Sequence, residues 1–149
     1  MFKCYGFDLD GTIIDSEPYH YQAYKNQCPD LSYIEYQRIF HNEELKKTYT
    51  KDNNIDIVKK EEDFKTLYEV NKKYIPGAIE YINSLILDNK DIVIVTNSSR
   101  ERCDFIKKMH PELVNIQHWI TKSDVKHKKP NPDGYIKAMN MFSYNIDEY

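Results

Sequence analysis

Three polar segments of this chain carry side chains suited to acid–base and phosphate chemistry. In the first, Phe7-Asp8-Leu9-Asp10-Gly11-Thr12, two carboxylates lie two residues apart beside a glycine. The second is Thr96, which directly follows the apolar run 92–95. The third is Lys128-Lys129-Pro130-Asn131-Pro132-Asp133, where two prolines restrain a pair of lysines. All three follow apolar or β-branched stretches, so each is predicted to end a strand.

Each segment also has an ordinary structural explanation. An Asp-Gly pair favours a hairpin turn, a threonine before two serines is typical of a helix N-cap, and a lysine in a charged run usually faces solvent. A calcium loop counted from Asp8 is excluded, because its sixth position is Ile13 instead of glycine and its twelfth is Tyr19 instead of glutamate. The hairpin, the N-cap and the solvated lysine stay open as alternatives.

Together, an acidic pair, a hydroxyl and a lysine suit phosphoryl transfer. One carboxylate can attack phosphorus and form an aspartyl-phosphate, while the second acts first as general acid and then as general base. A hydroxyl, backbone amides and a lysine stabilise the phosphoryl oxygens as charge develops. Magnesium is implied because carboxylates and a phosphate dianion repel one another: at ~4 Å and an effective dielectric of ~20, each contact costs roughly 4 kcal/mol.

The elements that must position these groups follow from the apolar pattern. Residues 3–9 and 92–95 are predicted strands, with a third over 118–121. The continuous β-branched run 92–95 is typical of a strand buried on both faces in a parallel sheet. Helices are predicted over 16–27, 31–49, 61–75, 77–88, from about 100 to 109, and from about 133 to 141.

This order of elements indicates an α/β fold with a helical insert after the first strand. Right-handed crossovers place the carboxyl ends of parallel strands at one edge of the sheet, and ligands of open α/β sheets bind there. We therefore expect the three polar segments to converge at that edge.

The composition excludes several functional classes. A net charge of −3 over 149 residues provides no basic surface for nucleic acid, and no apolar run approaches the roughly 18 residues of a membrane helix. Leu, Ile, Val and Phe make up 36 of the 149 residues, about 24%, which lies above the roughly 20% below which folding becomes doubtful and argues against disorder. The N-terminus lacks the apolar stretch of a signal peptide. Three widely spaced cysteines without a CxxC pair are typical of reduced thiols. We expect an intracellular, cytoplasmic protein with no membrane or nucleic-acid partner.

The ordered motifs resemble those of the haloacid dehalogenase-like (HAD) superfamily. The first motif is Asp8-Leu9-Asp10-Gly11-Thr12, the second Thr96-Asn97, and the third Lys129-Pro130-Asn131-Pro132-Asp133. The opening stretch FDLDGTIIDSEPYH is most similar to the beta-phosphoglucomutase and phosphoglycolate phosphatase branch. The resemblance implies a Rossmann-like core formed by residues 1–14 and 76–149, with a small α-helical cap over residues 15–75.

The resemblance also implies roles for individual residues. Asp8 is expected to be the nucleophile, Asp10 the general acid and base, and Lys129 the group that stabilises developing charge. Thr96 and the Asn97 backbone are expected to bind phosphate. The ligands of Mg²⁺ would be Asp8 and the Asp10 carbonyl.

Three further positions are candidates for substrate binding. Gly11 and Thr12 belong to the first motif. His20 falls where mutase-like relatives carry a cap-facing histidine, although an ordinary helix-surface or packed histidine is an equal alternative. The implied activity is Mg²⁺-dependent hydrolysis of a small phosphorylated metabolite, with a phosphatase favoured over a phosphomutase.

The fourth motif of the family, an acidic pair after another strand, is not found. The chain ends with Asn145-Ile146-Asp147-Glu148-Tyr149, where that strand would begin. We therefore expect a core incomplete at its C-terminus, weak Mg²⁺ binding and an open apolar edge along residues 3–8. The alternative is a truncated, catalytically impaired relative that binds phosphate or a partner. A receiver-type phosphoacceptor domain is disfavoured, because no aspartate ends a strand between residues 50 and 75.

Overall fold

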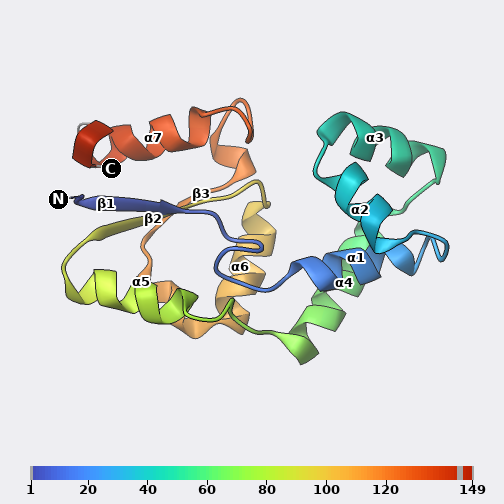
Figure 1. Cartoon of the computed structure of the whole chain (residues 1–149), viewed down its shortest axis with the longest axis horizontal. Helices are drawn as coiled ribbons and strands as arrows, with labels where there is room; N and C mark the ends of the chain where they lie inside the picture. The colour runs from blue at the N-terminus through green and yellow to red at the C-terminus, as the bar shows by residue number, and fades with distance from the viewer. Residues whose placement is uncertain (1, 144–145, 149) are drawn as a thin grey trace. The chain divides into compact units, whose positions relative to one another are not determined.

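The chain forms two compact units in the computed structural model, which describes residues 2–143 and 146–148 (Figure 1). Met1–Asp15 and Lys73–Tyr149 form one, which we call the α/β unit. Ser16–Lys72 form the other, which we call the helical unit. The predicted role of residues 15–75 as a cap stays a prediction.

The α/β unit is built on a three-stranded parallel sheet. Its strands are β1 (Cys4–Phe7), β2 (Asp91–Val95) and β3 (His118–Ile120), in the order β1-β2-β3. The β1–β2 register runs from Cys4 opposite Asp91 to Phe7 opposite Ile94, and β3 pairs with Val93–Val95. The predicted α/β fold with a parallel sheet is confirmed, and all three strands end at the same edge.

Helices cover both faces of this sheet (Figure 1). Helix α7 (Asp133–Phe142) lies on one face and α5 (Ala78–Leu87) on the other. Val93 and Val95 join the buried cluster that includes Ala138 of α7. Because side chains alternate along a strand, Ile92 and Ile94 point to the opposite face, and both are buried. Burial on both faces is what the β-branched run predicts.

The remaining elements of the α/β unit connect the strands. Helix α6 (Arg100–Met109) follows β2 and leads through the 3-10 turn η1 (Pro111–Asn115) to β3. Pro111 therefore ends α6 as predicted and also begins η1. After β3 come the 3-10 turn η2 (Lys122–Asp124), α7 and η3 (Ile146–Glu148).

Helix α7 approaches the sheet unusually closely at Gly134. A Cβ atom added there would lie 2.6 Å from Cγ1 of Val95 on β2. Such a separation is far inside van der Waals contact, so only glycine fits this position. The first turn of α7, which directly follows the third motif, is thereby held against the end of β2.

The helical unit contains four helices around an aromatic core. They are α1 (Glu17–Lys25), α2 (Tyr33–Phe40), α3 (Glu43–Asp52) and α4 (Ile57–Asn71). Helix α1 packs on α4, and α2 packs on α3. The buried cluster contains Tyr24, Leu31, Tyr36, Ile39 and Ile55.

Two of the helices predicted in this unit have wrong boundaries, and N-capping residues explain where the observed helices begin. The helix predicted over 31–49 is two helices, because Asn42 is extended and its Oδ1 accepts hydrogen bonds from the backbone N–H groups of Glu44 and Leu45. The helix predicted over 61–75 begins at Ile57, because Asp56 caps it by accepting from the Lys59 N–H. It ends at Asn71.

Two findings bear on the environment of the chain. Across residues 2–143 and 146–148, no helix has both the length and the apolar character needed to cross a bilayer. Cys4, Cys28 and Cys103 are all free thiols.

Candidate active site

The first motif forms a tight turn directly after β1. The Leu9 carbonyl accepts hydrogen bonds from the N–H groups of Ile13 and Ile14, and Gly11 adopts a left-handed φ of 72°. A residue with a side chain rarely takes that conformation, which explains the glycine. Leu9 is fully buried while Asp8 and Asp10 on either side are not. The turn thus anchors Leu9 in the core and holds both carboxylates at the end of the strand.

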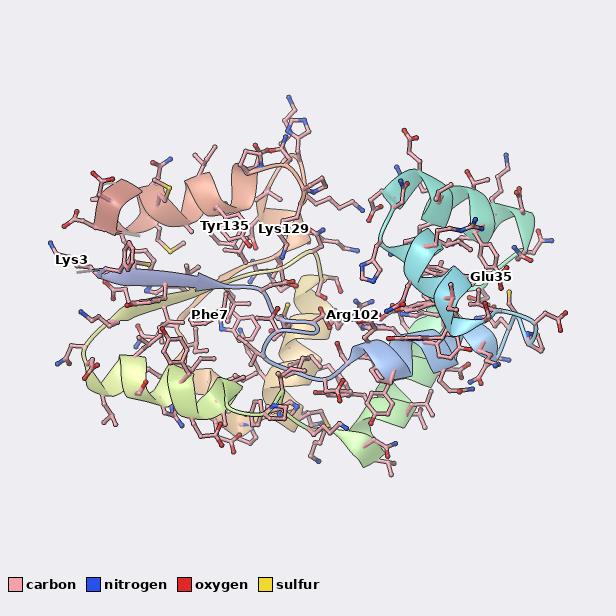
Figure 2. All side chains as sticks on the ribbon, viewed as in Figure 1. Lys3, Phe7, Glu35, Arg102, Lys129 and Tyr135 are labelled. Atoms are coloured by element: carbon pink, nitrogen blue, oxygen red, sulfur yellow. The ribbon has the colours of Figure 1, made fainter. Side chains whose placement is uncertain are left out.

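Lys129 lies between the ends of β1 and β2. Its Nζ is 2.6 Å from Oδ1 of Asp8 and donates to the Val95 carbonyl at 2.9 Å. Oδ1 of Asp8 also accepts from the Leu9 N–H at 2.8 Å. Figure 2 shows Lys129 and Arg102 on the side of the sheet where β1 ends, opposite Lys3 at its start. The first and third motifs therefore meet at one ion pair.

Asn97 holds the backbone of Lys129. Its Nδ2 donates to the Lys129 carbonyl at 3.0 Å, and its Oδ1 accepts from the Lys129 N–H at 2.9 Å. This pair of hydrogen bonds joins the second motif to the third. The side chain of Asn97 thus has a positioning role in addition to the predicted role of its backbone in phosphate binding, which stays a prediction.

Thr96 is buried at the end of β2. Its N–H donates to the Ile120 carbonyl at 2.9 Å, and its Oγ1 accepts from the Ser98 N–H at 3.1 Å. Thr96 lies between Val95, whose carbonyl binds Lys129, and Ser98, whose hydroxyl binds Asp10. The structure therefore places Asp8, Asp10, Thr96, Asn97 and Lys129 around one end of the sheet.

Ser98 belongs to this group, and sequence reasoning missed it. Its Oγ donates to Oδ2 of Asp10 at 2.8 Å and accepts from Nη1 of Arg102 at 3.3 Å. In the sequence, Ser98 and Ser99 both look like helix-capping residues. The only signal that separates them is that Ser98 is three residues beyond the end of β2, whereas Ser99 is the N-cap of α6.

The electrostatics of the site exclude a thiol nucleophile. Cys103 is buried next to the site, and burial raises the pKa of its thiol to about 11, with the negative charge of Asp10 adding to the effect. A thiol with that pKa stays protonated at neutral pH. Cys103 is therefore not suited to act as a thiolate nucleophile at this edge.

Hydrogen bonds and an ion pair hold both ends of the loop that carries Lys129. Arg100 Nη2 contacts both carboxylate oxygens of Asp124 at 2.6 Å, and Asp124 also accepts from the Thr121 N–H and hydroxyl. Burial opposes ionisation of Asp124, but these hydrogen bonds and the Arg100 charge together hold its pKa below the usual value. The Asp133 carboxylate binds the His127 N–H at 3.0 Å. The segment between β3 and α7 is thus tied to α6 and to the start of α7.

The other predicted substrate-binding residues occupy different settings. Gly11 and Thr12 are exposed in the turn after β1. His20 lies on α1 of the helical unit, where its ring stacks on Phe64 at 3.9 Å and its Nδ1 is 2.8 Å from Nζ of Lys60. These are the contacts of a packed histidine, and the predicted role of His20 towards a substrate stays a prediction.

The donors at the site fit a magnesium ion that is shared with a substrate. Among the described residues, no three His, Cys, Asp or Glu side chains gather so as to hold a metal ion. Mg²⁺ usually keeps water ligands and binds proteins through one or two carboxylates plus substrate phosphates. The Asp8 side chain is 40% exposed, so one of its oxygens is accessible as such a ligand. The Asp10 carboxylate, in contrast, is engaged by Ser98.

Comparison with known sequences identifies relatives of this chain. The family model for haloacid dehalogenase-like hydrolases matches residues 6–149. Glycerol-1-phosphate phosphohydrolase 1 of Saccharomyces cerevisiae is 30% identical over 160 residues, covering 95% of this chain and 60% of that protein. (DL)-glycerol-3-phosphatase 2 of Arabidopsis thaliana is 27% identical, covering 91% and 63%. The chain thus spans about 60% of the length of the curated relatives that it matches.

Solved structures show the same fold. CbbY from Rhodobacter sphaeroides, in complex with phosphate, superimposes with a TM-score of 0.80 at 18% identity, covering 99% of this chain and 76% of that one. A family IA, variant 3 HAD hydrolase from Entamoeba histolytica has a TM-score of 0.78 at 23% identity, covering 95% and 70%. These similarities confirm the architecture, including the presence of a helical unit after the first strand.

Proposed function

Because the chain belongs to the haloacid dehalogenase-like hydrolase family, we propose that it hydrolyses the phosphate monoester of a small metabolite through an aspartyl-phosphate on Asp8. The observation that carries the proposal is the 2.6 Å contact between Lys129 Nζ and Asp8 Oδ1 at the carboxyl ends of two adjacent parallel strands. A carboxylate next to an ammonium, at the edge where α/β sheets bind ligands, suits attack on an anionic phosphoryl group.

The contacts of Asp8 support its role as nucleophile. Within the described part of the chain, both hydrogen bonds that its carboxylate accepts go to Oδ1, from Lys129 and from the Leu9 N–H. We assign the attack on phosphorus to one oxygen of this carboxylate and leave the other as the oxygen that would reach a metal ion. As the bond from the attacking oxygen to phosphorus forms, the bond from phosphorus to the ester oxygen breaks, and the ester oxygen takes a proton from Asp10.

The second half of the reaction returns the enzyme to its starting state. Asp10, now ionised, accepts a proton from water as the water oxygen bonds to phosphorus and the Asp8–phosphorus bond breaks. Lys129 and Thr96 stabilise the phosphoryl oxygens in both steps. The Asp8 carboxylate and the Asp10 carbonyl would hold a Mg²⁺ ion, which would neutralise charge between the carboxylates and the phosphate dianion.

The substrate class is proposed from the relatives. Two of them are named for glycerol phosphates, and another, 25% identical, is named a 2-deoxyglucose-6-phosphate phosphatase. These are small polyol or sugar monoesters, which favour a phosphatase over a phosphomutase for this chain. The helical unit is proposed to act as the cap of this site, with His20 contributing to substrate binding.

The test is phosphate release from glycerol 1-phosphate and 2-deoxyglucose 6-phosphate, each measured with Mg²⁺ and with a chelator. We expect Mg²⁺-dependent turnover that is lost in Asp8→Asn and retained in the matched control Asp88→Asn, an exposed carboxylate after α5. Metal-dependent turnover that survives Asp8→Asn would refute the assignment of the nucleophile. Phosphate binding without turnover would favour the non-catalytic alternative.

A further inference from the structure

Ser98 makes a hydrogen bond that the proposed chemistry has not yet used. Its hydroxyl carries one proton, and that proton is donated to Oδ2 of Asp10 at 2.8 Å. Oγ of Ser98 in turn accepts a hydrogen bond from the Arg102 guanidinium at 3.3 Å. Arg102, Ser98 and Asp10 therefore form a chain of hydrogen bonds that runs in one direction and ends on the carboxylate assigned to proton transfer.

The backbone of Ser98 is held on both sides. Its N–H donates to Oγ1 of Thr96 at 3.1 Å, and its carbonyl accepts from the Lys122 N–H at 3.2 Å. The residue is only 4% exposed. With the backbone held and water largely excluded, the hydroxyl has a defined direction, and that direction is towards Asp10.

Such a bond matters because the terminal torsion of an aspartate is soft. Rotation about that torsion is broad instead of confined to three wells, so an unrestrained carboxylate samples orientations that do not suit proton transfer. A donor fixed on Oδ2 selects one plane for the carboxylate. Misplacement of a catalytic group by about 1 Å is costly for rate.

We propose that Ser98, with Arg102 behind it, is a positioning residue that fixes the Asp10 carboxyl group for proton transfer to the leaving oxygen. This proposal rests on the proposed function, in which Asp10 is the general acid. In the step concerned, the Asp8–phosphorus bond forms, the bond from phosphorus to the ester oxygen breaks, and the Asp10 proton moves to that oxygen. Ser98 keeps its own proton throughout.

A comparison of leaving groups tests this role. An alkyl phosphate releases a strongly basic alkoxide that needs a proton, whereas p-nitrophenyl phosphate releases a weakly basic phenolate that does not. The ratio kcat/KM reports only the steps up to departure of the leaving group, so hydrolysis of the aspartyl-phosphate does not enter it. In Ser98→Ala we expect kcat/KM for glycerol 1-phosphate to fall at least tenfold, a part of the roughly 10²–10⁴-fold that acid–base catalysis supplies. For p-nitrophenyl phosphate we expect less than about a threefold fall.

Neighbouring variants separate positioning from loss of structure. Ser99→Ala removes the N-cap of α6 and should lower the thermal midpoint without changing the ratio between the two substrates. Ser98→Thr restores a hydroxyl and should recover part of the loss with the alkyl ester. If the added methyl group is not tolerated, Arg102→Gln provides a second test, with a smaller loss that is again selective for the alkyl ester.

Asp10→Asn distinguishes failure of this proposal from failure of the proposed function. If kcat/KM falls selectively for the alkyl ester in both Asp10→Asn and Ser98→Ala, the proposal is supported. Selective loss in Asp10→Asn, together with equal loss for both substrates in Ser98→Ala, overturns the positioning role alone. Equal loss for both substrates in Asp10→Asn overturns the general-acid role, and the positioning role with it.

Discussion

The side chain of Asn97 should control how well Lys129 is placed, and its removal gives a sharp test of the site geometry. Asn97→Ala deletes both hydrogen bonds to the Lys129 backbone, at 3.0 and 2.9 Å. A typical protein hydrogen bond has a net worth of about 1 kcal/mol. Because the freed backbone groups are exposed and water can solvate them, we expect a total cost of about 1–2 kcal/mol.

That cost should appear in catalysis more than in global stability. If this free-energy cost affects only the conformation of the loop, the fraction of molecules with Lys129 next to Asp8 drops by a factor of roughly 5–30. The value of kcat should then fall by the same factor. If the cost instead lowers the free energy of unfolding of the whole α/β unit, the thermal midpoint should drop by about 2–4 °C for each kcal/mol. Phosphate-release kinetics and a thermal melt on the same samples separate the two outcomes.

Two controls complete this experiment. Asn83→Ala changes an exposed asparagine on α5 and should leave both kcat and the thermal midpoint unchanged. Lys129→Ala gives the limit in which the ammonium is lost completely. Full kcat in Asn97→Ala alongside an inactive Lys129→Ala would refute the reasoning, because the lysine would then be placed without the asparagine.

Three further predictions follow from packing and charge. Gly134→Ala should destabilise the protein by about 1–3 kcal/mol in denaturant unfolding, because the new Cβ overlaps Val95; unchanged stability would contradict that close packing. Nitrogen NMR should find the neutral His20 ring with its proton on Nε2, because the Lys60 ammonium can only donate a hydrogen bond, which Nδ1 must accept. Lys60→Met should remove this preference for the Nε2-protonated tautomer. An Nδ1-protonated ring in the parent would be inconsistent with the contact. The pKa of Asp124 is lowered in the folded state, so its carboxylate should add about 1 kcal/mol to the free energy of unfolding at neutral pH. That contribution is lost as the pH falls below about 3.8. The free energy of unfolding of Asp124→Asn should therefore be lower than that of the parent at pH 7 and converge with it in acid.

The sequence by itself determined the α/β class and the end of β2 at Val95, whereas the strand predicted over 3–9 is shorter in the structure, at Cys4–Phe7. The β-branched run 92–95 and the polar residues after it are local signals, since burial on both faces and the exit of the chain from a sheet leave their mark on adjacent residues. The predicted helix boundaries were less accurate where a capping side chain determines the start of a helix. Asn42 divides the stretch predicted as one helix, because its side chain competes for backbone N–H groups.

Only the tertiary structure decided which side chains meet. Lys129 and Asp8 are 121 positions apart, and Ser98 and Asp10 are 88 apart. The pairing of β1 with β2 brings Ser98 next to Asp10, and the packing of α7 against Val95 holds the segment that carries Lys129 at the same edge. Ser98 and Ser99 are identical neighbours in a stretch that resembles a cap, yet one binds a carboxylate and the other begins a helix. Local sequence cannot separate them, because the direction of a side chain depends on backbone geometry that distant contacts impose.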